Sequence, residues 1–107
     1  LKVNQKIIFY EDINNEVKQG YWIISLGSTA ILENMKLAKM LRNRGAKVGM
    51  DLEEKSMKSQ LRRADRFNAS KVIIRGDNEL NNDIVIIKDL ENHSQEELPL
   101  ENFIESI

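Results

Sequence analysis

Cysteine is absent from this chain of 107 residues, and histidine occurs only once, as His93. The first absence excludes disulfides and metal sites built from thiolates. A single imidazole does not make a metal site on its own, and no nucleophile lies at a spacing that would make it a catalytic partner. We therefore expect neither a metal nor a cofactor in this segment.

Long apolar runs are also missing. No stretch approaches the roughly 20 apolar residues that cross a bilayer, and no signal peptide is visible. This predicts no membrane partner and a cytoplasmic location. The chain shows no low-complexity linker, so its length predicts a single domain. Because it begins with leucine rather than methionine, we expect a domain of a longer polypeptide whose catalytic centre lies elsewhere.

The net charge of −1 hides a separation of charge along the chain. Residues 36–75 carry twelve Lys and Arg against four Asp and Glu, whereas residues 76–107 carry one Lys against nine acids. One interpretation is that the helices have ordinary solvated faces. The other is a basic surface that attracts phosphate groups. Composition alone leaves both open.

Short apolar runs alternate with amphipathic stretches over most of the chain. Strands are predicted at residues 21–26, 47–52, 71–75, 83–88 and 94–98. Helices are predicted from 28 or 29 to 44, from 56 to 68 and from 99 onward, and a turn at 89–93 joins the last two strands. Before residue 21 the pattern is weaker, with a short strand at 6–10 and a polar turn at 11–18.

This order predicts an α/β fold with a mixed five-stranded sheet flanked by helices. Alternating strands and helices require parallel pairing through crossovers, whereas the final hairpin is antiparallel. The domain is expected to span residues 21–107, with residues 1–20 as an N-terminal extension of unknown role.

The sequence also predicts how the first helix begins and ends and which face it buries. The hydroxyl of Ser28 or Thr29 is expected to cap its start, and Gly45 is expected to end it. The apolar face that packs on the sheet is predicted at helical spacing: Ile31, Met35, Ala38 and Leu41.

Residues 56–90 carry most of the functional information. Met57, Leu61 and Ala64 recur at i, i+4 and i+7, which places apolar groups on one helical face. A basic stripe recurs every four residues on a different face: Lys58, Arg62 and Arg66. Between two buried strands, residues 76–82 are predicted by composition to form a loop.

Catalytic templates fit this sequence badly. The strand end at 26–29 lacks the repeated glycines and the lysine of a phosphate-binding loop. Asp77 and Glu79 could pair as acid and base, but carboxylates in a loop are usually solvated. The sequence therefore predicts a binding module rather than an enzyme in its own right.

Nucleic-acid binding suits the residues better. Lys and Arg contact phosphates, while Glu79 and the asparagines beside it offer acceptors and donors to unpaired RNA bases. A sheet end carrying Glu79 and Lys88 is a plausible platform for such bases. In the competing interpretation Glu79 only caps its own loop, and Lys88 pairs with Asp89 or Glu91. The chemistry by itself does not choose between them.

The spacing of several short motifs resembles that of a known protein family. Residues 58–90 contain K-x-Q-L-x-x-A-D, then G-x-x-E-L, then V-x-x-K-D-L, and residues 41–51 read L-R-x-x-G-x-x-V-x-x-D. The matching residues of the three later motifs are Lys58, Gln60, Leu61, Ala64, Asp65, Gly76, Glu79, Leu80, Val85, Lys88, Asp89 and Leu90. This pattern resembles the C-terminal anticodon-binding domain of histidyl-tRNA synthetase over about residues 23–107. It departs from the family at 91–94, where Glu-Asn-His-Ser stands in place of the usual Thr-Gly-Glu.

The resemblance implies a mixed sheet of this kind and roles for several residues. In related class II synthetases the glutamate of G-x-x-E and the basic residue closing the next strand contact anticodon bases, which implies such contacts for Glu79 and Lys88. Lys58, Gln60 and Arg62 complete the implied RNA-binding set, with Arg62 on a phosphate. The implied partner is the anticodon loop of histidine tRNA.

The parent protein that the resemblance implies is a homodimeric histidine–tRNA ligase that uses ATP and magnesium. The catalytic motifs of such an enzyme are absent from this segment. Two alternatives stay open. One is a histidyl-synthetase-like regulatory subunit of ATP phosphoribosyltransferase, and the other is a protein-interaction or tRNA-sensing module of the kind found in a kinase that responds to uncharged tRNA.

Overall fold

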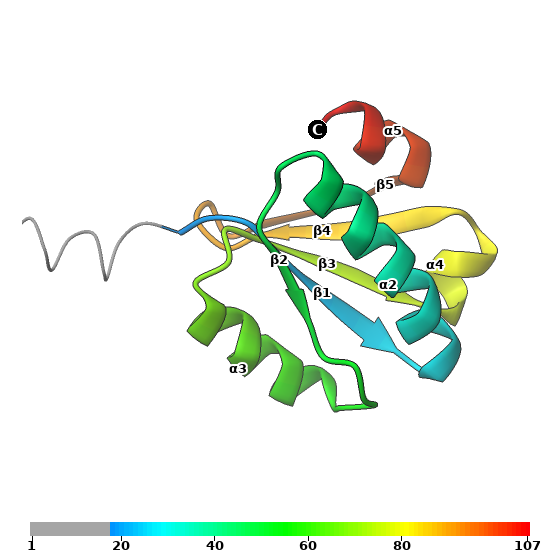
Figure 1. Ribbon diagram of the computed structural model, residues 1–107, viewed down its shortest axis with the longest axis horizontal. Helices are drawn as coiled ribbons and strands as arrows, with labels where there is room; N and C mark the ends of the chain where they lie inside the picture. The colour runs from blue at the N-terminus through cyan, green and yellow to red at the C-terminus, as the bar shows by residue number, and fades with distance from the viewer. Residues whose placement is uncertain (1–17) are drawn as a thin grey trace, which may run out of the picture.

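A computed structural model describes residues 18–107 of the chain (Figure 1). The strands are β1 (Tyr21–Leu26), β2 (Val48–Met50), β3 (Lys71–Gly76), β4 (Ile84–Asp89) and β5 (Ser94–Pro99). The helices are α2 (Ser28–Asn43), α3 (Met57–Phe67), α4 (Asp77–Asn81) and α5 (Leu100–Glu105). The strand predicted at 6–10 and the turn predicted from residue 11 lie outside the described residues.

The five strands form one mixed sheet in the order β2-β1-β3-β4-β5, so the predicted fold class is confirmed. β1 pairs in parallel with β2 and β3, because α2 and α3 each return the chain to the same end of the sheet. β3, β4 and β5 follow one another as antiparallel neighbours. Val72 lies opposite Lys88 in this register, which fixes the end of β4 beside the start of β3.

Successive side chains of the strands point to opposite faces of the sheet, and each face has its own hydrophobic core. Ile23, Ile73 and Val85 point to one face of the sheet, where residues of α2 and α5 cover them. Ile24 and Val72 point to the other face, where Ala64 of α3 is fully buried. Figure 1 shows the consequence, with α2 and α3 on opposite sides of the sheet. α3 makes its main contacts with β1 and β2, and Ile86 of β4 packs at the edge of the core that α3 covers.

Helix α2 differs in two details from its prediction. Gly27 is the N-cap residue, with φ of 112°, and no side chain caps the helix, so the expected hydroxyl cap is wrong. Met35 was expected in the apolar face, yet 44% of it is exposed, and Asn34 is fully buried in its place. The buried face of α2 therefore includes a polar residue that hydrophobic periodicity does not reveal.

Buried Asn34 belongs to a polar cluster between α2 and the sheet. Its Nδ2 donates to Ser25 Oγ at 2.8 Å, and Arg75 Nη1 donates to its Oδ1 at 3.3 Å. Burial lowers the pKa of the Arg75 guanidinium from its ordinary value. These bonds satisfy polar groups that would otherwise destabilise the core.

Residues 76–82 are not a plain loop, because they contain the short helix α4. The Gly76 amide donates to Glu79 Oε1 at 2.6 Å, so a side chain three residues into the turn satisfies a free N–H at its start. The prediction of a loop is wrong here, since the polar composition that suggests a loop also suits a one-turn capped helix.

The turn predicted at 89–93 is confirmed as the connection between β4 and β5. The Asp89 carboxylate accepts from the amides of Glu91 and Asn92 at 2.9 and 3.0 Å, and from the side chain of Asn92 at 3.0 Å. Such local bonds hold a tight turn in place of further backbone pairing. His93 takes a positive φ of 55° at the end of this turn.

Asp89 should titrate below the ordinary aspartate value of about 3.9. The amide and side chain of Asn92 lower the pKa of Asp89, because both donate to its charged form. The turn is therefore held above the ordinary pKa and loosens as pH falls through the lowered one. Carbon-detected NMR titration should show this shift, and Asn92→Ala should remove part of it while Asn102→Ala should not. An ordinary pKa in the wild type would contradict the turn geometry.

No helix in residues 18–107 is both long enough and apolar enough to span a bilayer.

Candidate nucleic-acid interface

Helix α3 positions the basic side chains that the sequence singled out. Ser56 caps it by accepting from the Ser59 amide at 3.1 Å, and Asn68 ends it in the left-handed conformation with φ of 62°. Ala64 is buried, while Met57 and Leu61 pack at the edge of the core. The helix predicted at 56–68 and its apolar face are confirmed. The basic stripe consists of exposed residues on the remaining surface: Lys58, Arg62 and Arg66.

A groove of about 600 Å³ runs between α3 and the end of β4. Its lining consists of Met57, Lys58, Leu61, Arg62 and Asp65 from α3, with Lys88 and Leu90 from the end of β4. It forms because α3 packs against β1 and β2 and leaves the neighbouring surface of β4 open. The groove combines an apolar floor with a charged rim, an arrangement suited to holding an unpaired base beside its phosphate.

Three of the predicted residues meet in this groove: Lys58, Arg62 and Lys88. The ion pairs within residues 18–107 are Lys36–Glu33, Lys55–Glu53 and Arg63–Asp51, so none of the three cations forms an ion pair there, and Asp65 is the one acid in the groove lining. The competing interpretation paired Lys88 with Asp89 or Glu91, and the described residues show neither pair. The Asp89 carboxylate instead serves the turn.

Glu79 lies away from this groove. It follows the C-terminal end of β3, whereas Lys88 pairs with Val72 at the start of that strand. Val72 and Gly76 are four residues apart, or roughly 13 Å at about 3.3 Å per residue of strand, and Glu79 lies beyond Gly76. Figure 1 shows α4 and the β4–β5 turn at opposite ends of the sheet. The expectation that Glu79 and Lys88 share one sheet end is therefore wrong.

The carboxylate of Glu79 is largely enclosed, with 8% of the residue exposed. Oε1 accepts from the Gly76 amide, and Oε2 accepts from Asn78 Nδ2 at 3.3 Å. The capping role of Glu79 is thus present in the structure. A carboxylate offers about four acceptor positions, however, and these partners use two of them. Capping α4 and accepting a hydrogen bond from a base are chemically compatible.

Gln60 has a structural position that the sequence did not suggest. It is 1% exposed, and its Oε1 accepts from the Ser25 amide at 3.0 Å. Its Nε2 donates to the carbonyls of Ser25 and Lys55, each at 2.9 Å. The side chain has no free surface for RNA, so the structure assigns Gln60 to holding α3 on β1 instead of to direct contact.

Acidic side chains gather at the β5 edge of the sheet. The exposed ones are Glu96 and Glu97 on β5 with Glu101 and Glu105 on α5. The basic helices α2 and α3 cover opposite faces, but both make their main contacts with β1, toward the other edge of the sheet. The charge separation along the sequence is therefore also a separation across the sheet, from the basic β2 edge to the acidic β5 edge.

Residues 18–107 contain no cluster of three His, Cys, Asp or Glu side chains that could hold a metal ion. The lining residues that sequence reasoning did not assign to an interface are Asp65 and the three apolar residues of the floor, Met57, Leu61 and Leu90. In the sequence these apolar residues look like core residues. Only the structure, where the neighbouring surface of β4 is uncovered, shows that they line a groove.

The family model and the similar sequences indicate the same protein family. The model of the family described as "Anticodon binding domain" matches residues 22–107. A histidine–tRNA ligase of Desulfitobacterium hafniense is 38% identical over 92 residues, which cover 86% of this chain and 22% of that protein. One of Natranaerobius thermophilus is 36% identical over 107 residues, covering 100% of this chain and 25% of that protein. The chain thus spans about a quarter of the length of these relatives.

Solved structures agree with the sequence comparison. Apo S. aureus histidyl-tRNA synthetase superposes with a TM-score of 0.78 and 26% identity over 97% of this chain and 32% of its own. The RNA binding domain of threonyl-tRNA synthetase from Cryptosporidium parvum reaches a TM-score of 0.72 at 18% identity, over 82% of this chain and 22% of its own. The second likeness shows the shared fold alone. The chain belongs to the anticodon-binding domain family, and its domain is of the kind that histidyl-tRNA synthetases carry.

Proposed function

We propose that this domain binds the anticodon stem-loop of a histidine tRNA on behalf of a histidine–tRNA ligase. The observation that carries the proposal is the groove between α3 and β4, where Lys58, Arg62 and Lys88 surround an apolar floor and form no ion pair among the described residues. Free cations beside apolar surface suit phosphates and unpaired bases together. The names of the matched family and relatives support the choice of tRNA.

Each residue has a distinct task in this proposal. Lys58 and Arg62 neutralise phosphates, which fixes the RNA strand along α3. Lys88 lies across the groove from them and contacts an anticodon base. Glu79, whose carboxylate α4 holds in place, accepts from a second base at the far end of the sheet. Gln60 supports the interface indirectly, by fixing α3 on the sheet.

The rest of the parent protein would supply the reaction. A ligase of this kind would bind ATP and magnesium in a catalytic domain and would act as a homodimer in the cytoplasm. The present domain would add affinity and anticodon specificity, and by itself would neither aminoacylate tRNA nor hydrolyse ATP. We keep the parent's activity and assembly as part of the proposal.

Lys88→Gln should weaken binding of the cognate anticodon stem-loop by about two- to fivefold, because it removes one charged contact with a base at the surface. Fluorescence anisotropy with labelled RNA at two salt concentrations measures this. The matched control is Lys39→Gln, an equal loss of charge on the exposed side of α2.

Two outcomes would contradict the proposal. The wild-type chain could bind a stem-loop of unrelated sequence as tightly as the cognate one, or Lys39→Gln could weaken binding as much as Lys88→Gln. Either result would mean that the groove is not the RNA site and that only net charge attracts the RNA.

A further inference from the structure

The solvent side of α3 carries a second, smaller hollow of about 130 Å³. Its lining consists of Lys55, Ser59, Arg62, Arg63 and Arg66. Within the helix these positions are three and four residues apart, so their side chains share one face. Four cations and one hydroxyl group therefore converge on a space with no acidic residue in its lining. Like charges placed together in this way repel one another unless an anion lies between them.

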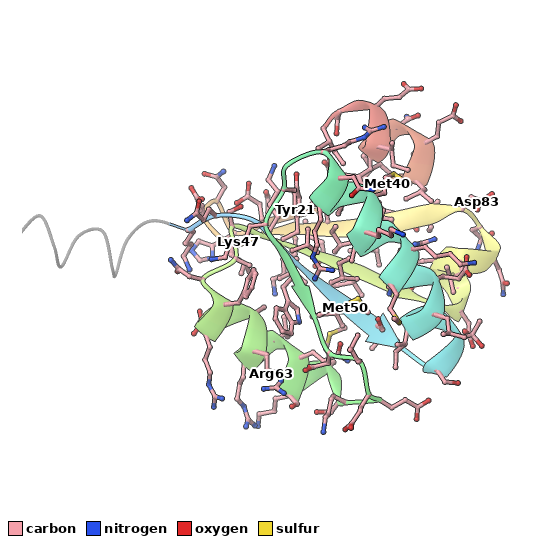
Figure 2. The ribbon with its side chains drawn as sticks, viewed as in Figure 1. Tyr21, Met40, Lys47, Met50, Arg63 and Asp83 are labelled. Carbon is pink, nitrogen blue, oxygen red and sulfur yellow. The ribbon has the colours of Figure 1, made fainter. Side chains whose placement is uncertain are left out.

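Arg63 is held in position by a buried carboxylate behind the hollow. Its Nε donates to Asp51 Oδ1 at 2.7 Å, and Asp51 is 7% exposed. This contact uses only Nε, and the described residues give the two terminal nitrogens of Arg63 no partner. The guanidinium is thus oriented in advance while its terminal donors stay available. In Figure 2 Arg63 lies over α3, on the side of the molecule away from α2 and α5.

The start of α3 adds to the positive potential. No acidic residue occupies the first turn of this helix of 11 residues, so the partial charge of its N-terminus is not neutralised there. Ser59 lies in that turn, and its amide is already bonded to Ser56 Oγ. Of the four cations, Arg63 is paired with Asp51 and Lys55 with Glu53; the second pair, at 3.5 Å, is exposed and therefore weak.

Size and position identify the ligand. Pockets for small organic ligands measure roughly 300–1,000 Å³, so a hollow of about 130 Å³ suits a compact anion instead. Arg62 lines both this hollow and the groove between α3 and β4. We infer that the hollow binds one backbone phosphate of the RNA strand whose unpaired bases lie in that groove. This inference rests on the proposed function and adds a contact with the phosphate that precedes or follows the bound base.

Two variants of the 107-residue chain test the hollow. Arg66→Gln removes one cation at an exposed position, and should weaken binding of the cognate stem-loop by roughly three- to tenfold. It should also reduce the salt dependence of log K by about 0.7 to 0.9, the loss of one phosphate contact. Ser59→Asp places a negative charge in the hollow and should weaken binding similarly, yet it should keep the melting temperature, because an acid suits the first turn of a helix.

A phosphate contact also has a signature that a base contact lacks. Both variants should weaken cognate and altered anticodon loops by the same factor, so the ratio of the two affinities stays constant. Lys39→Gln, with the same loss of charge on α2, should leave the salt dependence unchanged and affinity within twofold. Arginine Nε–H signals of Arg62, Arg63 and Arg66 should shift together on adding the stem-loop.

The possible outcomes distinguish a failure of the phosphate site from a failure of the proposed function. If Arg66→Gln and Ser59→Asp keep the wild-type affinity while Lys88→Gln binds more weakly, the hollow is not a phosphate site and the proposed function still stands. Absence of RNA binding by the wild-type chain would overturn both. Equal arginine shifts on adding inorganic phosphate alone, at matched ionic strength, would make this a site for a free anion and would overturn its assignment to RNA.

Discussion

Gln60→Ala should lower the free energy of unfolding by about 3 kcal/mol, because it leaves buried backbone groups without partners. The groups are the N–H and C=O of Ser25, and the partly buried bond to the C=O of Lys55 is lost as well. Urea unfolding followed by circular dichroism and by fluorescence of Trp22 measures the change. A domain of this size has a total stability of roughly 5–15 kcal/mol, so the loss would be a large fraction of it.

The reason lies in the different lengths of β1 and β2. β2 pairs with β1 only from Tyr21 to Ile23, so Ser25 has no strand partner on that side. The amide of Gln60 takes the place of the missing peptide group, accepting from the Ser25 N–H and donating to its carbonyl. A glutamine side chain thereby extends the sheet beyond the end of β2. Only a side chain with both a donor and an acceptor can do this.

Gln95→Ala is the matched control for this prediction. Gln95 lies exposed on β5, and its replacement should change stability by less than about 0.5 kcal/mol. A Gln60→Ala loss no larger than that of Gln95→Ala would show that water or a local shift replaces the bonds of Gln60, and that the bridge to β1 is dispensable.

Glu79→Gln should reduce discrimination between the cognate and an altered anticodon by roughly 5- to 150-fold, the equivalent of about 1–3 kcal/mol for a specific base contact. The amide keeps the size of the carboxylate and one acceptor oxygen, but its NH₂ group donates where the carboxylate accepted. The melting temperature should fall as well, because the cap on the Gly76 amide loses its charge. Anisotropy with the two RNAs, within the parent protein, and a thermal melt of the same variant give both quantities.

Asp77→Asn controls for charge, since Asp77 is an exposed acid on the same helix. It should leave the ratio of affinities unchanged. If Glu79→Gln lowers the melting temperature and also leaves the ratio unchanged, Glu79 only caps α4 and its proposed role in reading a base is wrong.

Elements with a strong local pattern were predictable from the sequence. β1 has the predicted bounds, and α3 was foreseen with its apolar face, because a short apolar run between two glycines and a 3.6-residue period each favour one structure. α4 was missed because a single polar turn has no period. Its one signal was a glutamate three residues after Gly76, the spacing of a capping side chain.

The candidate site was predictable only in part, for a physical reason. Charge and motif spacing pointed to Lys58, Arg62 and Lys88, and these do meet in one groove. Whether a polar residue is buried depends on which strand ends where, and this is a tertiary property. Gln60 is enclosed because β2 stops at Met50, which nothing in the local sequence around Gln60 reveals.

The separation of charge between the β2 edge, where α2 and α3 lie, and the β5–α5 edge makes the domain an electric dipole. A polyanion at a distance greater than contact already exerts a torque on such a molecule, turning the β2 edge toward itself. The exposed acids of β5 and α5 repel the same polyanion, so encounters in the wrong orientation separate quickly. The acidic half thus contributes to recognition without touching RNA, by making productive collisions a larger share of all collisions.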